Sequence, residues 1–219
     1  MSSSRSKKPG QYHHGDLRQA LVHAALRELE HGRAADLSLR ALGRALGVSP
    51  RAPYRHFATK ESLLAAVAVE GLGRWEAFVT PRVAAAGPSP VAQLRAVGEA
   101  YVLFAVEHPA AFRVMYAPYA TVEEGAPELV RARSEGHQAA LEVILAGQKA
   151  GLLRGGDPMQ LALACWTSMH GLAVLLTEGQ LGRYDRPIDA AKLSRLVSGL
   201  LFEGLLARPS GTVKARKRD

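Results

Sequence analysis

Cysteine is nearly absent from this sequence, which has only Cys165. A single thiol excludes an internal disulfide framework and any zinc site built from cysteines, and it favours a reducing compartment such as the cytoplasm. Aromatic residues are also few, at 6%, so the core must consist mainly of Leu, Val and Ala. The first eleven residues are polar and basic and contain no apolar segment, so we expect no secretory signal there.

The sequence also lacks the alternation of period two that is typical of strands, whereas apolar residues recur at spacings of three and four along most of its 219 residues. We therefore predict an all-α fold of one or two domains with about nine helices. The expected helices cover residues 16–31, 38–46, 50–57, 59–81, 91–108, 110–116, 127–150, 158–178 and 189–207. Residues 84–90, with the sequence AAAGPSP, are expected to form a linker.

Acidic residues are scarce at both ends of the chain. Residues 1–60 contain 11 Lys and Arg against 4 Asp and Glu, and residues 208–219 contain 5 against 1, whereas residues 61–207 contain 12 against 15. A basic module on a slightly acidic body indicates that one part of the protein contacts a polyanion. The alternative is that the basic ends are only solvated tails.

A Gly-Val-Ser sequence at 47–49 separates two of the predicted helices. Gly47 permits a left-handed backbone conformation in which a Cβ is costly, and Val48 can pack between the two helices. Ser49 can cap the following helix, and Pro50 suits its first position, where no amide hydrogen is needed. This arrangement predicts a helix-turn-helix, whose second helix can enter the major groove of DNA. Taken alone, the motif also fits a small helical corner in an unrelated core.

The residues that follow carry a family resemblance. The sequence YRHF at 54–57 is followed by ATKESLL at 58–64, and it resembles the tetracycline-repressor (TetR) family, whose DNA-binding module ends in a Tyr-x-x-Phe recognition helix before Lys-Glu-x-Leu. The resemblance covers residues 12–72 and includes AA at 24–25, Gly32, LSLR at 37–40 and GVS at 47–49. It implies a DNA-binding transcription regulator with a larger helical body that pairs with a second copy and encloses a ligand.

Nine residues of this region are expected to contact DNA, namely Arg40, Arg44, Ser49, Arg51, Ala52, Tyr54, Arg55, His56 and Lys60. Arg51 lies near the start of the recognition helix and can form two hydrogen bonds with a guanine edge. Arg40 and Arg44 lie four residues apart on one face of the preceding helix and suit contacts with the DNA backbone. Tyr54 and His56 have polar tips that suit phosphates.

Three further residues complete the expectation for this surface. Arg55 fits either a DNA contact or an ion pair with a carboxylate. Lys60 adds positive charge at a helix start, which is unfavourable for an isolated helix but suits a bound phosphate, although a solvated lysine is the alternative. Pro53 departs from the family pattern, because its missing amide and its ring are expected to distort the recognition helix and to push Ala52 away from helical angles. Helix placement is therefore predicted more firmly than base readout.

Residues 159–177 contain no Lys, Arg, Asp or Glu. Polar residues within the segment, among them Gln160 and His170, and the lack of flanking basic clusters argue against a membrane span and favour a fully buried helix. The last helix has a wide apolar face, which indicates a homodimer whose last two helices pair across the interface. The residues expected in that interface are Leu193, Leu196, Val197, Leu200, Leu201 and Leu205.

The sequence Trp166-x-x-x-His170-Gly171 resembles the Trp-His-Gly signature of one C-terminal subtype of the TetR family. For His170, a core histidine with satisfied hydrogen bonds is the alternative. In such a fold the remaining helices enclose a ligand cavity, and each candidate lining residue also fits a plain core. The candidates are Trp75, Phe78, Tyr101, Phe104, Phe112, Met115, Tyr116, Trp166, Met169 and His170.

These observations predict a flexible basic arm (1–15), a helix-turn-helix DNA-binding domain (16–62), a helical effector-binding and dimerisation domain (63–207) and a disordered basic tail (208–219). The expected function is that of a repressor, located at the nucleoid in the bacterial cytoplasm, that leaves its palindromic operator when a small apolar or aromatic ligand binds. A dimeric regulator without a ligand, or an activator, is the alternative. We expect no cofactor, no metal site and no enzymatic activity, because the sequence has no Gly-rich phosphate loop and no metal-ligand spacing.

Overall fold

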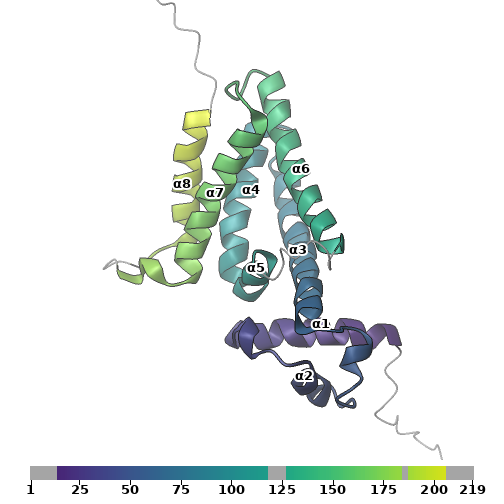
Figure 1. Cartoon of the computed structure of the whole chain (residues 1–219). Coiled ribbons are helices and arrows are strands. Elements are labelled where there is room, and N and C mark those ends of the chain that lie inside the picture. The colour runs from purple at the N-terminus through teal and green to yellow at the C-terminus, as the bar shows by residue number, and fades with distance from the viewer. Residues whose placement is uncertain (1–13, 118–126, 184–186, 206–219) are drawn as a thin grey trace, which may run out of the picture. The chain divides into compact units, whose positions relative to one another are not determined.

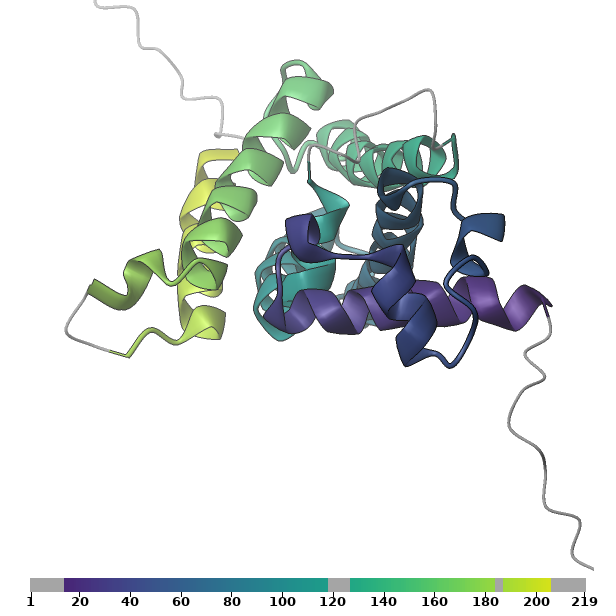
Figure 2. The same cartoon turned by 60° about the horizontal axis from the view of Figure 1, so that its bottom comes forward.

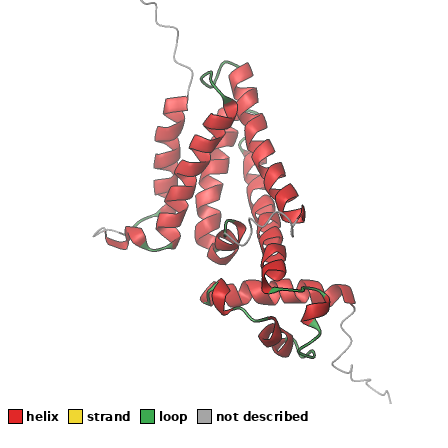
Figure 3. Cartoon of the chain, in the orientation of Figure 1, coloured by secondary structure: helices red, strands yellow, loops and turns green. Residues whose placement is uncertain are grey.

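The computed structural model describes residues 14–117, 127–183 and 187–205, and every regular element in these ranges is a helix (Figure 1, Figure 3). The α-helices are α1 (His14–His31), α2 (Leu39–Ala45), α3 (Lys60–Ala85), α4 (Pro90–Glu107), α5 (Pro109–Met115), α6 (Pro127–Lys149), α7 (Pro158–Thr177) and α8 (Ala190–Leu205). Within the described ranges, the 3₁₀ helices between them are η1 (Ala34–Asp36), η2 (Pro53–Arg55) and η5 (Gln180–Arg183). The predicted all-α fold is confirmed. The predicted tail and residues 1–13 of the predicted arm lie outside the described residues.

The described residues form two compact units. The first contains those within 1–74 and 108–133, and the second contains those within 75–107 and 134–219. Helix α3 begins in the first unit and ends in the second, and so does α6, so the chain passes between the units in the middle of two helices. The first unit therefore combines the helix-turn-helix region with α5, which is distant from it in sequence.

Helix α1 provides much of the core of the first unit. It contacts α2, η2 and α5 and is drawn in purple in Figure 2. Its buried residues recur at helical spacing on one side, as Leu21, Ala25 and Leu29 do. At the carboxyl end of α1, Arg113 of α5 donates a hydrogen bond from Nη2 to the backbone oxygen of Leu29 over 3.1 Å. This bond satisfies a carbonyl that the end of the helix leaves without an intrahelical donor.

Helices α3 and α5 approach each other closely at Gly71. A Cβ at this position would lie 3.0 Å from the side chain of Met115 and 3.2 Å from the backbone oxygen of Ala111. Only a hydrogen at this position lets the two helices pack together without displacing one another. The amino-terminal half of α3 is therefore fixed to α5 as well as to the helix-turn-helix region.

The second unit is organised around α4, which packs against both α7 and α8 (Figure 1). Its core cluster contains Leu94 of α4, Ile144 of α6, Leu153, and Phe202 and Leu205 of α8. Cys165 of α7 packs against this cluster. Burial raises the pKa of the Cys165 thiol to about 11, so the thiol stays protonated at neutral pH.

Helix α7 is far less buried than the sequence predicts. Only Met169, Leu172 and Ala173 are buried along its length, and 17% of its apolar window lies inside the chain. By length and composition α7 is able to cross a membrane. One such helix is weak evidence for a membrane span, because a core helix passes the same test. The prediction of a fully buried helix is wrong for the single chain, because the described helices that pack against α7 leave much of its surface exposed.

Helix α3 continues past the residue at which the sequence predicts its end. Pro81 lies inside the helix, which runs on to Ala85, so the segment between α3 and α4 is shorter than the predicted linker at 84–90. A proline removes one amide hydrogen from a helix, and here it does so only in the last two turns. Arg82 supports this region, because its Nη1 donates to the backbone oxygen of Phe78 over 2.7 Å and its guanidinium lies 3.5 Å from the Phe78 ring centre.

Candidate nucleic-acid interface

The first helix of the helix-turn-helix, α2, is closed at both ends by local hydrogen bonds. At its start, Ser38 Oγ accepts a bond from the Ala41 amide over 3.4 Å. At its end, the Val48 amide donates to the backbone oxygen of Gly43 over 2.9 Å, and the Gly47 amide donates to that of Arg44 over 3.0 Å. This is a Schellman motif, in which Gly47 takes the left-handed conformation with a φ of 70°. The predicted role of Gly47 in the turn is confirmed.

The recognition segment is a series of tight turns rather than the α-helix predicted over 50–57. Most of its hydrogen bonds join residues three apart, as from the Ala52 amide to Ser49 and from the Arg55 amide to Ala52, and only Pro53–Arg55 form a 3₁₀ helix. Pro53 has no amide hydrogen, so the α-helical bond to Ser49 cannot form. The expected distortion is confirmed, whereas the predicted α-helix is not formed.

Two local predictions for this segment are wrong. Ser49 does not cap the segment with its side chain, because Ala52 takes the N-cap position, which makes no side-chain hydrogen bond. Ala52 keeps helical angles, with φ −59° and ψ −42°, although it precedes a proline. The steric penalty before a proline is offset here, because hydrogen bonds to Ser49 and from Arg55 hold the Ala52 backbone on both sides.

Pro53 is buried and packs against α2 at Gly43. A Cβ on Gly43 would lie 2.9 Å from Cγ and 3.3 Å from Cδ of the proline ring. The two helical parts of the motif therefore meet at a position where one has no side chain and the other has a rigid ring. Sequence analysis missed this role of Gly43, and a glycine inside a predicted helix is the signal that points to such a close approach.

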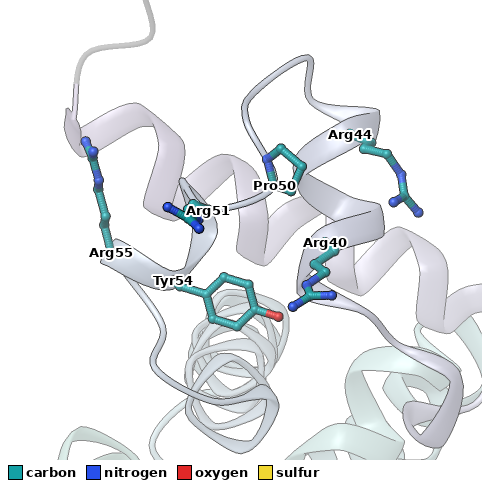
Figure 4. A pocket seen from close by; sticks show the side chains of 6 residues that line it. All are labelled: Arg40, Arg44, Pro50, Arg51, Tyr54 and Arg55. Carbon is teal, nitrogen blue, oxygen red and sulfur yellow. The ribbon is translucent and has the colours of Figure 1, made fainter.

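An open hollow with a volume of about 750 Å³ lies between α2 and the recognition segment. It is lined by Arg40, Arg44, Pro50, Arg51, Tyr54 and Arg55. Figure 4 shows the first two arginines on α2 and the other two on the segment that follows, with the Arg40 guanidinium and the Tyr54 hydroxyl pointing toward one another. The hollow thus brings together five of the nine residues that were expected to contact DNA. Pro50 was not among the expected contacts.

The positive charge of this hollow is not neutralised within the described part of the chain. None of its four arginines forms an ion pair or a side-chain hydrogen bond with a described residue, and all four are exposed. The ion pair considered for Arg55 is not formed with any carboxylate that the structure describes. Ser49 is exposed beside the hollow, whereas Ala52 and His56 are half-buried in the turn. Four fixed positive charges without carboxylates make this surface a binding site for an anion of extended shape.

Lys60, the first residue of α3, lies outside the hollow and already has a protein partner. Its Nζ donates to the backbone oxygen of Ala35 in η1 over 3.0 Å. The predicted cap of α3 is confirmed, because Thr59 Oγ1 accepts from the Ser62 amide over 3.1 Å and Ser62 Oγ accepts from the Thr59 amide over 3.2 Å. Lys60 therefore joins two elements of the first unit, and its ammonium group keeps two further hydrogens for a phosphate.

The candidate ligand-lining residues fall in different units. Phe112, Met115 and Tyr116 belong to α5 and its end, in the first unit, whereas the other seven belong to the second. In the second unit, Trp75 makes edge-on ring contacts with Tyr101 and Phe104, at centroid distances of 5.5 and 5.6 Å. These contacts form an aromatic cluster along α3 and α4.

A hydrogen-bonded set of three rings extends this cluster to α7. Trp166 Nε1 donates to the Tyr101 hydroxyl oxygen over 3.2 Å, and the same hydroxyl lies 2.9 Å from His170 Nδ1. His170 is half-buried, and this burial lowers its pKa. In the neutral tautomer that carries its hydrogen on Nε2, His170 accepts the hydroxyl hydrogen at Nδ1, and the tryptophan, the tyrosine and the histidine then form one directed chain.

The six residues expected in a dimer interface lie at different depths on α8. Leu196 and Leu200 are 58% and 62% exposed. Leu193 and Val197 are partly exposed, Leu201 packs against the core cluster, and Leu205 is buried within it. The buried side of α8 also includes Ser194 and Ser198, so part of the apolar face faces outward and part serves the chain's own core.

A basic hollow on a helix-turn-helix, joined to a helical body, defines a helix-turn-helix DNA-binding protein. Comparison with known proteins agrees with this class. Residues 21–67 match the family model described as bacterial regulatory proteins of the tetR family, and residues 94–200 match the model described as the tetracyclin repressor-like C-terminal domain. The chain belongs to the TetR family and is a DNA-binding transcription regulator.

Solved structures with the same fold include a protein of unknown function from Rhodococcus sp. RHA1, which is 31% identical, with a TM-score of 0.77 over 92% of this chain and 100% of that one. AibR in complex with isovaleryl coenzyme A and operator DNA is 20% identical, with a TM-score of 0.65 over 84% and 97%. PfmR from Thermus thermophilus, a TetR family transcriptional regulator, is also 20% identical, with a TM-score of 0.64 over 84% and 97%. No curated protein matches the chain significantly.

Proposed function

We propose that the protein is a cytoplasmic, homodimeric repressor that leaves a palindromic operator when a small apolar or aromatic ligand binds. The observation that carries the DNA-binding part is the set of four arginines around one hollow of the helix-turn-helix, none of which is paired with a carboxylate among the described residues. A duplex presents phosphates and base edges that such a surface can bind. A homodimer supplies two of these surfaces, which favours an operator with two-fold symmetry.

The dimer is supported by the outward face of α7 and α8. Leu163 and Leu175 of α7 and Leu196 and Leu200 of α8 are exposed, although they are large and apolar. Small residues lie among them, and Gly171 of α7 has nothing within 4 Å of the position of a Cβ. An apolar face with small residues allows helices of a second copy to approach closely, as in a four-helix bundle.

The ligand is supported by the aromatic cluster of the second unit and by its polar centre. A site for a small molecule is usually apolar with few polar groups that fix orientation, and Tyr101, Trp166 and His170 supply such groups among aromatic rings. AibR, which shares the fold, has been solved with a coenzyme A thioester and operator DNA together. A dimeric regulator without a ligand, or an activator, remains the alternative, and neither has a specific observation in its favour.

The DNA-binding part is tested with Lys60→Ala in gel shifts at two or more salt concentrations. Without the lysine, binding to every sequence should weaken about equally, and the salt slope should fall by about 0.9 for each phosphate that a subunit no longer neutralises. Lys149→Ala removes an equal charge from the end of α6 and serves as the control, with no expected change. If Lys60→Ala leaves affinity and slope unchanged, Lys60 does not bind phosphate.

The ligand-responsive part is tested by the same gel shifts in the presence of a panel of small aromatic and apolar compounds. A compound that binds the second unit should lower DNA affinity, and DNA should lower the affinity for that compound by the same factor. Trp75→Ala should abolish the effect of the compound without changing DNA affinity in its absence. A crystal structure with a completely filled second unit would instead favour the regulator without a ligand.

A further inference from the structure

The helix-turn-helix offers one side-chain type for bidentate base readout. Residues 39–58, from the start of α2 to the end of the recognition segment, contain four arginines and no Asn, Gln, Asp or Glu, and the whole sequence has no asparagine. Asn and Gln pair bidentately with adenine, and Asp and Glu accept from cytosine, whereas Arg pairs with N7 and O6 of guanine. Bidentate readout by this surface is therefore directed to guanine.

The four arginines divide into two pairs according to the element that carries them. Arg40 and Arg44 lie on α2, the first helix of the motif, which in this class crosses the DNA backbone. Arg51 and Arg55 lie on the recognition segment, which is the part that enters the major groove (Figure 4). The second pair is therefore placed to meet base edges, and the first pair to meet phosphates.

The recognition segment holds this second pair at a fixed separation. Pro53 lies between Arg51 and Arg55, its ring packs against Gly43, and hydrogen bonds between residues three apart run on both sides of it. An α-helical turn rises about 1.5 Å per residue and a 3₁₀ turn about 2 Å, so the four steps from Arg51 to Arg55 span roughly 6–8 Å along the segment. Successive bases of a strand are about 3.4 Å apart, so this separation corresponds to roughly two base steps.

We infer that Arg51 and Arg55 are the base-reading residues and that each operator half-site contains two guanines, two or three base pairs apart, bound at N7 and O6. The inference rests on the proposed function, because it assigns sequence specificity to the same DNA-binding surface. Arg40 and Arg44 bind the flanking phosphates. Specificity thus depends on two arginine side chains whose positions are set by one proline.

The first experiment is a selection of bound duplexes from a random pool by the full-length protein, followed by sequencing. The expected result is an enriched imperfect palindrome with two guanines in each half-site at the stated spacing. Half-sites enriched only in A·T pairs would overturn the inference and leave DNA binding itself intact. If no duplex is retained from the pool, the proposed function fails and the inference fails with it.

The second experiment combines a change in the DNA with a change in the protein. Each guanine of the selected half-site is replaced in turn by 7-deazaguanine, which keeps base pairing but removes the N7 acceptor in the major groove. The wild-type protein should lose about 5- to 150-fold in affinity at each of the two positions. Arg51→Ala should abolish the loss at one guanine and Arg55→Ala the loss at the other.

Arg44→Ala is the matched control, because it removes an arginine of the same hollow that is assigned to a phosphate. It should weaken binding to normal and 7-deazaguanine DNA by the same factor. Circular dichroism melting of each variant establishes that it is folded. If 7-deazaguanine has no effect on the wild type, or the same effect on wild type and on Arg51→Ala and Arg55→Ala, these arginines do not read guanine.

Discussion

At the scale of single residues, Gly43 and Pro53 determine how closely the recognition segment lies on α2. The proline ring occupies the space in which a Cβ of residue 43 would stand. Proline also limits the backbone of the segment and removes one amide hydrogen, so the turn cannot relax into a regular α-helix. The unusual proline at position 53 therefore packs against an equally unusual glycine at position 43, ten residues earlier in the chain.

We expect Gly43→Ala to destabilise the first unit, although alanine normally favours a helix more than glycine does. A Cβ 2.9 Å from Cγ of Pro53 forces the segment away from α2, and overpacking of this kind costs about 1–3 kcal/mol. Thermal unfolding followed by circular dichroism should show a midpoint lower by several degrees.

Gly73→Ala is the control for this substitution, because Gly73 lies in α3 with nothing within 4 Å of the position of a Cβ. This change should raise the unfolding free energy by up to about 1 kcal/mol, since glycine inside a helix is entropically unfavourable. If Gly43→Ala is as stable as Gly73→Ala, the packing of Pro53 on α2 does not limit residue 43.

The sequence predicts the effect of Pro53 itself but not its surroundings. The missing amide is a property of the residue, so the distortion of the recognition segment follows from the sequence alone. The angles of Ala52 depend on the bonds made by Ser49 and Arg55, and the burial of the ring depends on Gly43. These partners are supplied by the fold, which explains why the predictions for Ser49 and Ala52 were wrong.

At the scale of elements, α4 and α7 are joined by the chain of hydrogen bonds from Trp166 through Tyr101 to His170. Burial lowers the pKa of His170, so the folded protein resists protonation of this ring more than the unfolded chain does. A protonated Nδ1 is a donor and cannot accept the Tyr101 hydrogen. Acid therefore reverses this hydrogen bond and places a charge on a half-buried ring, which burial disfavours.

We expect His170 to make stability depend on pH. The unfolded chain takes up a proton on His170 near pH 6.5, and the folded chain does so only at lower pH, so its contribution to the unfolding free energy falls as the pH falls through 6.5. Urea unfolding between pH 8 and pH 5.5, at one protein concentration, measures this for the wild type and for His170→Gln. The stability difference between the two proteins should shrink toward low pH, and a constant difference would contradict the assignment.

The starts of α3 and α7 are fixed by side chains close to them in the sequence. Asp157 caps α7 by accepting from the Met159 amide over 2.9 Å, and Thr59 caps α3 in a similar way. Both caps use residues within three positions, so a short window contains the information. Burial of α7 depends instead on how many helices the fold places around it. The absence of charged residues from its sequence does not predict how many there are.

At the scale of the whole molecule, the outward apolar face of α7 and α8 is the surface that we propose for dimerisation. We expect Leu196→Glu together with Leu200→Glu to convert the dimer into a monomer. The dimer would then bury four carboxylates, at a cost of roughly 3 kcal/mol or more. Light scattering coupled to gel filtration measures the mass directly.

The control for the interface is Leu145→Glu, which places one charge on an exposed leucine of α6, outside this face. This variant should remain dimeric. If the double variant on α8 also elutes as a dimer with unchanged melting behaviour, the two copies pair through another surface. The outcome thus separates the proposed face from exposed apolar residues in general.

The chain leaves the first unit inside α3, returns at α5 and leaves it again inside α6. A fragment that stops after the helix-turn-helix would therefore lose the partner of Gly71 and the donor that closes the end of α1. Exchange of DNA specificity between relatives by grafting would then have to carry α5 along with the amino-terminal residues. The DNA-binding surface is continuous in sequence, but the unit that supports it is assembled from two separate segments of the chain.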